Sequence, residues 1–193
     1  ASEKNSSSNS PWFFLGLAIL TKGPVALILI TLTLSSFLFT QKKWNNLFAK
    51  IKPKKGILIT LLISLPWYII EFFKEGKAFS DSFFGYHNFQ RYTSVVNNHS
   101  EPIWFFIYIL VIASLPFTPF LFYGIFEAFK DLISNFRKSS KTSESLFIYS
   151  LCWLSSVLIF FSISATKLPS YWLPATPAAA ILISSSLNKL KVE

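Results

Sequence analysis

The feature that most constrains this chain is a series of apolar runs, each near the length that crosses a lipid bilayer. The runs lie at about residues 11–40, 56–73, 102–126, 145–164 and 172–187. A membrane-spanning helix needs ~20 predominantly apolar residues, and these runs lack the periodicity of soluble helices. Only 14% of the residues are charged, against ~25% in soluble domains. The sequence therefore predicts an all-α, polytopic transmembrane helix bundle of about six membrane segments.

A Thr-Lys pair closely followed by proline occurs at two places in these runs. The first run contains Thr21-Lys22-Gly23-Pro24, and the last two flank Ala165–Tyr171, which contains Thr166-Lys167-Leu168-Pro169. A single kinked helix and a tight turn between two helices both fit the first interruption. Proline disfavours helical backbone at the preceding residue, which favours the turn.

The distribution of lysine predicts the orientation in the membrane. The segment 41–55 carries six lysines and no acidic residue, which places it in the cytoplasm. Because successive spans cross the membrane in opposite directions, Lys22, the segment 74–101 and Lys167 are then predicted on the outer side. The predicted organisation is a polar linker at 1–10, a membrane domain at 11–187 with outer loop 74–101 and cytoplasmic loops 41–55 and 127–144, and a cytoplasmic tail at 188–193.

Other features of the composition exclude or favour broad classes. The net charge of +9 does not indicate nucleic-acid binding, because the lysines gather at the ends of apolar runs rather than among aromatic residues on one face. The single cysteine, Cys152, has no internal disulfide partner and is expected in the core. The chain has no methionine and opens on a polar linker, so we expect an internal fragment of a longer protein.

The predicted outer side gathers the basic and imidazole groups of the chain. The candidates for an anion site are Lys22, His87, Arg91, His99 and Lys167. Arginine offers a planar, bidentate fork and lysine a compact charge, and both suit a lipid phosphate. His87 and Arg91 are four residues apart, so a helical turn would put them on one face. In the alternative interpretation each lysine reaches the membrane surface independently, and the segment is an ordinary interfacial connector.

Metal and enzymatic motifs are weak by comparison. His87, His99 and Glu101 offer a possible metal set, but their spacing matches no compact zinc pattern, and hydrogen bonding to phosphate or sugar hydroxyls is the favoured role. No cofactor is expected. The sequence contains no Walker motif, dinucleotide fingerprint or nucleophile elbow, and no recognisable pair of catalytic carboxylates.

Three ordered segments carry a family resemblance: GLAILTKGPVALILI, HNFQRY with HSEPIWFFIYIL, and TKLPSYWLPATPAAAIL. They resemble the ArnT-like and protein O-mannosyltransferase superfamily of membrane glycosyltransferases, the GT-C fold, over nearly all of residues 11–187. The resemblance implies transfer of a sugar from a polyprenyl-phosphate carrier to lipid A, protein or another acceptor at the outer face of a bacterial inner membrane. It implies that the cavity for carrier phosphate and sugar is faced by Lys22, His87, Arg91, His99, Lys167 and Tyr171.

The chain departs from the family pattern in two ways. The catalytic acid of the family, usually an aspartate, lies in the first outer loop, upstream of these residues, so the chain alone is expected to be inactive and no catalytic residue is assigned in it. Ser170 stands where the family usually has threonine. A transporter or flippase of lipid-linked sugars would use the same basic corners without chemistry, and a purely structural subunit would not need them.

Overall fold

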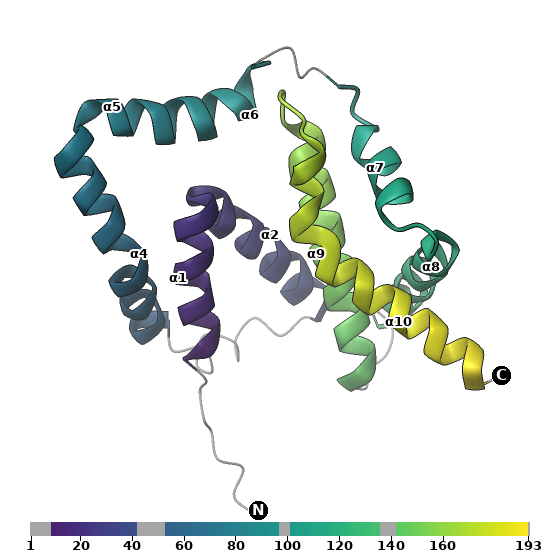
Figure 1. Ribbon diagram of the computed structural model, residues 1–193. Helices are drawn as coiled ribbons and strands as arrows, with labels where there is room; N and C mark the ends of the chain where they lie inside the picture. The colour runs from purple at the N-terminus through teal and green to yellow at the C-terminus, as the bar shows by residue number, and fades with distance from the viewer. Residues whose placement is uncertain (1–8, 42–52, 97–100, 136–141, 193) are drawn as a thin grey trace, which may run out of the picture. The chain divides into compact units, whose positions relative to one another are not determined.

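Helices make up most of the part of the chain that the structure describes. The computed structural model describes residues 9–41, 53–96, 101–135 and 142–192, and no strand occurs in these ranges (Figure 1). The elements are α1 (Ser10–Lys22), α2 (Pro24–Gln41), α4 (Pro53–Glu75), α5 (Lys77–Ser80), the π-helix η1 (Asp81–Gln90), α6 (Arg91–Thr93), α7 (Phe105–Ala113), α8 (Thr118–Asn135), α9 (Thr142–Ile163), the 3₁₀ helix η2 (Pro169–Ala175) and α10 (Thr176–Val192).

These elements form two compact units. The first comprises residues 1–30 and 43–90, and the second comprises residues 31–42 and 91–193. The chain passes from one unit to the other within α2, again after residue 42, and a third time between η1 and α6.

The predicted all-α membrane fold is confirmed, but the predicted number of about six membrane segments is not. Within the described ranges, three helices are long and apolar enough to cross a membrane: α2, α4 and residues 146–163 of α9. A fourth span is reached if the bent pair of α7 and α8 counts as one. Helix α1 has 13 residues and α10 has 17, and each is shorter than the ~20 residues of a full span.

The predicted span over residues 102–126 is not one continuous helix. Helix α7 ends at Ala113, α8 begins at Thr118, and the two axes are bent by 117°. Pro116 and Pro119 lie at this break, where each lacks an N–H and restricts the preceding residue. The hydroxyl of Thr118 donates to the carbonyl of Val111 at 2.7 Å and so satisfies a backbone group at the end of α7.

The predicted turn within the first apolar run is confirmed. Helix α1 ends at Lys22, and Gly23 follows with φ of 62°, in the left-handed region that favours glycine. The N–H of Gly23 donates to the carbonyl of Ile19 at 2.7 Å. Pro24 then begins α2, where a fixed φ and a missing N–H do no harm.

In the first unit, α1 and α4 run side by side in the same direction (Figure 1). Small side chains line their contact, as is usual where membrane helices approach closely. Gly56 lies under the ring of Trp12, where an added Cβ would come 1.9 Å from Cε2 of the tryptophan. Thr60, one turn further along α4, donates from its hydroxyl to the Trp12 carbonyl at 3.0 Å.

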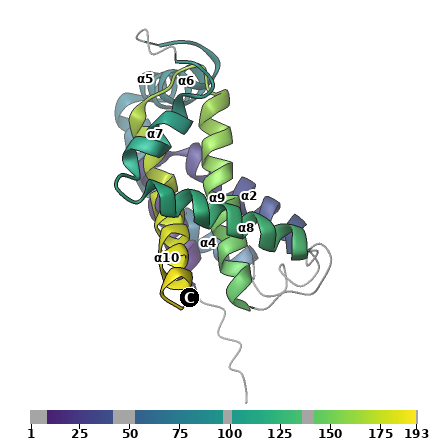
Figure 2. The ribbon, with the colours of Figure 1, turned by 90° about the vertical axis from the view of Figure 1, so that its right-hand side faces the viewer.

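In the second unit, α8, α9 and α10 pack against one another (Figure 2). The packed core includes Leu121, Ile148 and Leu182, whose side chains are fully buried. Gly124 allows α8 to approach α10, since an added Cβ would lie 2.4 Å from the carbonyl oxygen of Leu182. The hydroxyl of Ser186 in α10 donates to the Phe120 carbonyl of α8 at 2.6 Å.

An ion cluster joins α8 to the end of α10. The carboxylate of Glu127 lies 3.0 Å from Nζ of Lys130 and 2.8 Å from Nζ of Lys189. The hydrogen bond to Glu127 raises the pKa of Lys189 above its ordinary value. Because these side chains are partly exposed, the cluster orients the helix ends more than it stabilises them.

Candidate functional site

The corner after α9 is tied by hydrogen bonds to the segment that begins at Arg91. The backbone N–H of Thr166 donates to the Arg91 carbonyl at 3.0 Å, and that of Ala165 donates to the Tyr92 carbonyl at 2.9 Å. The hydroxyl of Ser164 also reaches the Arg91 carbonyl, at 3.2 Å. Arg91 is therefore anchored through its backbone to the residues that directly precede Lys167.

Lys167 is held inside this corner. Its side chain is only 7% exposed, and Nζ donates to the carbonyl of Ser164 at 2.8 Å. Ser164 directly follows the last residue of α9, where a helix carries partial negative charge, so an ammonium is stabilised there. The Lys167 side chain is therefore held in a buried position at the end of α9.

Aromatic rings hold both sides of the corner on α9. The ring of Tyr171 in η2 stacks on Phe161, with centroids 4.6 Å apart and planes 29° apart. Tyr92, the neighbour of Arg91, stacks on Phe160 at 5.0 Å and 26°. Two adjacent residues of α9 thus position Tyr92, which follows Arg91, and Tyr171, which lies four residues after Lys167.

A second corner, in the first unit, carries Lys22. Lys22 is the exposed last residue of α1, and Gly23 after it packs against η1. An added Cβ on Gly23 would lie 2.9 Å from Cε1 of Phe83 and 3.7 Å from Nδ2 of Asn88. His87 belongs to the same π-helix, so this corner lies against the element that bears the first histidine.

The predicted site residues are divided between the two units. Arg91, Lys167 and Tyr171 lie together in the second unit, whereas Lys22 and His87 lie in the first. Residues 77–93 of the predicted outer loop are helical. His99 falls outside the described residues. Within the described residues no group of three His, Cys, Asp or Glu side chains is placed to hold a metal, and the set with His99 stays a prediction.

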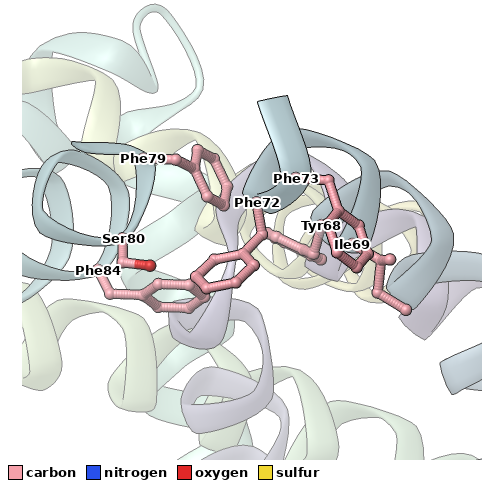
Figure 3. A pocket seen from close by; sticks show the side chains of 7 residues that line it. All are labelled: Tyr68, Ile69, Phe72, Phe73, Phe79, Ser80 and Phe84. Atoms are coloured by element: carbon pink, nitrogen blue, oxygen red, sulfur yellow. The ribbon is translucent and has the colours of Figure 1, made fainter. Parts of the chain in front are cut away.

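An apolar groove of about 440 Å³ lies in the first unit between α4 and the α5–η1 segment. Figure 3 shows the aromatic side chains of α4 gathered with those of α5 and η1 around it. The hydroxyl of Tyr68 at its edge donates to the Ile19 carbonyl at 2.7 Å. The groove suits a hydrocarbon group and offers no charge to hold a phosphate. Its lining consists of Tyr68, Ile69, Phe72, Phe73, Phe79, Ser80 and Phe84.

Sequence reasoning missed Ser164 and Thr166. Both are buried, with exposed fractions of 3% and 1%, and their hydroxyls bond to residues about 70 positions earlier. A serine and a threonine at the end of an apolar run carry no signal for such contacts. The Thr-Lys pair predicted a site at this corner, but only because of its lysine.

The chain is similar in sequence and fold to proteins named as arabinosyl transferases. No family model matches the chain. An uncharacterised protein of Aquifex aeolicus is 31% identical over 178 residues, which cover 92% of this chain and 37% of that protein. The undecaprenyl phosphate-alpha-4-amino-4-deoxy-L-arabinose arabinosyl transferase 2 of Pseudomonas fluorescens is 30% identical over 197 residues, covering 100% of this chain and 34% of the relative.

A solved structure agrees with these relatives. The crystal structure of ArnT from Cupriavidus metallidurans bound to undecaprenyl phosphate superposes with a TM-score of 0.79 at 27% sequence identity. The match covers 93% of this chain and 30% of that one. The chain spans about a third of the length of the curated relatives it matches.

Proposed function

From the premise that this chain is an ArnT-like segment of a GT-C membrane glycosyltransferase, we propose that the whole protein transfers a sugar from a polyprenyl-phosphate carrier. The acceptor is a lipid, of the lipid A type, or a protein, and transfer occurs at the outer face of a bacterial inner membrane. The observation that carries this proposal is the agreement in sequence and fold, over 93% of the chain, with an ArnT structure that holds undecaprenyl phosphate.

The basic groups have a defined chemical role in such a reaction. When the bond between sugar and carrier breaks, the carrier phosphate leaves and takes the bonding electrons. Preorganised cations stabilise the charge that develops on the leaving oxygen. A buried Lys167 and an Arg91 anchored beside it support this role, because charge interactions are stronger away from water.

The remaining predicted residues are assigned supporting contacts. Lys22 would bind the same phosphate as an exposed cation, and His87 and His99 would donate hydrogen bonds to phosphate or sugar hydroxyls. Tyr171, oriented by Phe161, would offer a phenolic hydroxyl to the phosphate. We assign no catalytic residue within this chain, and no metal or cofactor is required by these roles.

The test is sugar transfer by the full-length protein in membranes, with Arg91→Ala and Lys167→Ala as separate variants. Each is expected to lower the transfer rate by ~100-fold, since it removes a charge that interacts with the leaving group. Lys130→Ala is the matched control, because Lys130 is 59% exposed and pairs with Glu127. Its transfer rate should equal that of the unaltered protein.

Two results would contradict the proposal. Unchanged transfer by both variants, with normal amounts in the membrane, would remove Arg91 and Lys167 from the site. Movement of a lipid-linked sugar across vesicles by the purified full-length protein, with no glycosidic product, would indicate a transporter of lipid-linked sugars instead.

A further inference from the structure

We propose that Thr166, with Ser164, is a positioning residue that holds Arg91 and Lys167 in register to bind the carrier phosphate. The inference rests on the proposed function, since it concerns the geometry of that phosphate site. Neither hydroxyl is assigned a contact with substrate.

The hydroxyl of Thr166 bridges two points on the segment that follows Arg91. It donates to the carbonyl of Ser94 at 2.8 Å and accepts from the N–H of Val96 at 3.0 Å. Thr166 is 1% exposed, and both of these hydrogen bonds are partly buried. The segment up to five positions after Arg91 is thereby hydrogen-bonded to Thr166, the residue directly before Lys167.

Ser164 links the two cationic residues from the other side. Its carbonyl accepts from Nζ of Lys167, while its hydroxyl reaches the Arg91 carbonyl at 3.2 Å and the Thr166 carbonyl at 3.0 Å. The Lys167 ammonium and the Arg91 backbone thus meet on one buried residue. These contacts through Ser164 couple the position of the Arg91 backbone to that of the Lys167 side chain.

The other Thr-Lys corner provides an internal contrast. Thr21 precedes Lys22 as Thr166 precedes Lys167, but Thr21 is exposed and its hydroxyl donates to Ala18, in its own helix, at 2.9 Å. The same dipeptide therefore makes a local contact at one corner and a bridge across about 70 residues at the other. The bridge is a property of the fold around Thr166 rather than of the dipeptide.

Loss of the Thr166 hydroxyl should loosen this register without unfolding the corner. The backbone bonds from Ala165 and Thr166 to the 91–92 segment do not depend on the side chain. Valine keeps the shape of threonine but leaves the Ser94 carbonyl and the Val96 N–H without that partner. Loss of these hydrogen bonds costs free energy, and we expect residues 94–96, and Arg91 with them, to shift.

The experiment measures binding of a short-chain polyprenyl phosphate to the full-length protein in nanodiscs. Thr166→Val is expected to weaken binding by ~10-fold, because two partly buried hydrogen bonds that orient Arg91 are lost. Thr166→Ser retains the hydroxyl and should restore most of the affinity. Thr40→Val is the matched control: Thr40 is also buried, but its hydroxyl donates to Phe37 within its own helix, so affinity should be unchanged.

A double-mutant cycle with Arg91→Ala separates positioning from a general loss of stability. If Thr166 acts through Arg91, Thr166→Val should have little further effect on affinity in the Arg91→Ala background. Equal weakening by Thr166→Val in both backgrounds would overturn the inference. Ser164→Ala, expected to weaken binding by ~3-fold, gives a second cycle should Thr166→Val accumulate poorly.

The outcomes also distinguish this inference from the function on which it rests. If Arg91→Ala weakens binding but Thr166→Val and Ser164→Ala do not, the positioning role is wrong and the phosphate site stands. If Arg91→Ala and Lys167→Ala both leave binding unchanged, the phosphate site itself is wrong, and the positioning role falls with it.

Discussion

At the scale of single residues, glycines fix the points where helices end and meet. Gly23 has φ of 62°, and it lies directly under the ring of Phe83. Gly76 has φ of 57° but has open space around it, and Gly85 has neither constraint. Substitutions at the three glycines can therefore distinguish the effect of backbone strain from that of side-chain crowding.

Alanine substitution at these glycines should follow that order. Gly23→Ala is expected to lower the free energy of unfolding by about 2 kcal/mol, since it adds left-handed strain and a contact with Phe83. Gly76→Ala should cost about 1 kcal/mol from strain alone. Gly85→Ala should cost nothing. Thermal unfolding of the full-length protein in detergent measures all three, and equal midpoints for Gly23→Ala and Gly85→Ala would contradict this account.

At the scale of elements, α8 and α10 are held by close approach and a directed hydrogen bond. Gly124 lets the backbones come together, and Ser186 donates across the contact to Phe120. Ser150 in α9 is equally buried, but its hydroxyl donates to Leu146 in its own helix. The two serines thus differ in whether they join helices.

Serine-to-alanine substitutions test whether the bond between helices contributes to stability. Ser186→Ala is expected to lower the free energy of unfolding by about 1 kcal/mol, because it removes a hydrogen bond between α10 and α8. Ser150→Ala should change it little, since the Leu146 carbonyl retains its helical partner. Denaturation in a graded mixture of detergents checks both. Equal losses for the two variants would show that the contact between helices is not the cause.

At the scale of the whole molecule, the orientation of the chain in the membrane determines which helix ends face outward. The lysine distribution predicts that 41–55 is cytoplasmic and that 74–101 lies outside. Helix α4 connects these segments and is long enough to cross a bilayer. Its two ends therefore should lie on opposite sides of the membrane.

Cysteine labelling tests this orientation. In full-length protein with every native cysteine removed, including buried Cys152, single cysteines replace the exposed residues Lys54 and Lys77. A membrane-impermeant maleimide applied to intact cells is expected to label Lys77→Cys, while Lys54→Cys reacts only after permeabilisation. The opposite pattern would invert the predicted topology and move the basic corners to the cytoplasmic side.

The sequence by itself determined the helical membrane class and the break between α1 and α2. Apolar length sets where a helix can cross a bilayer, and Gly23, Pro24 and Pro169 end or begin helices through local backbone chemistry. Proline was underestimated at Pro116, where the chain bends by 117° instead of continuing. Local backbone chemistry was therefore sufficient at the break after Lys22, but it did not predict that residues 77–93 of the outer loop are helical.

Only the tertiary structure decided how the two Thr-Lys corners differ. In sequence they look alike, yet Lys22 is exposed and Lys167 is buried. The difference arises because residues 91–96 return to residues 164–166 and satisfy their hydrogen bonds. Contacts between segments about 70 residues apart depend on the path of the chain in space, which neither hydropathy nor local propensity encodes.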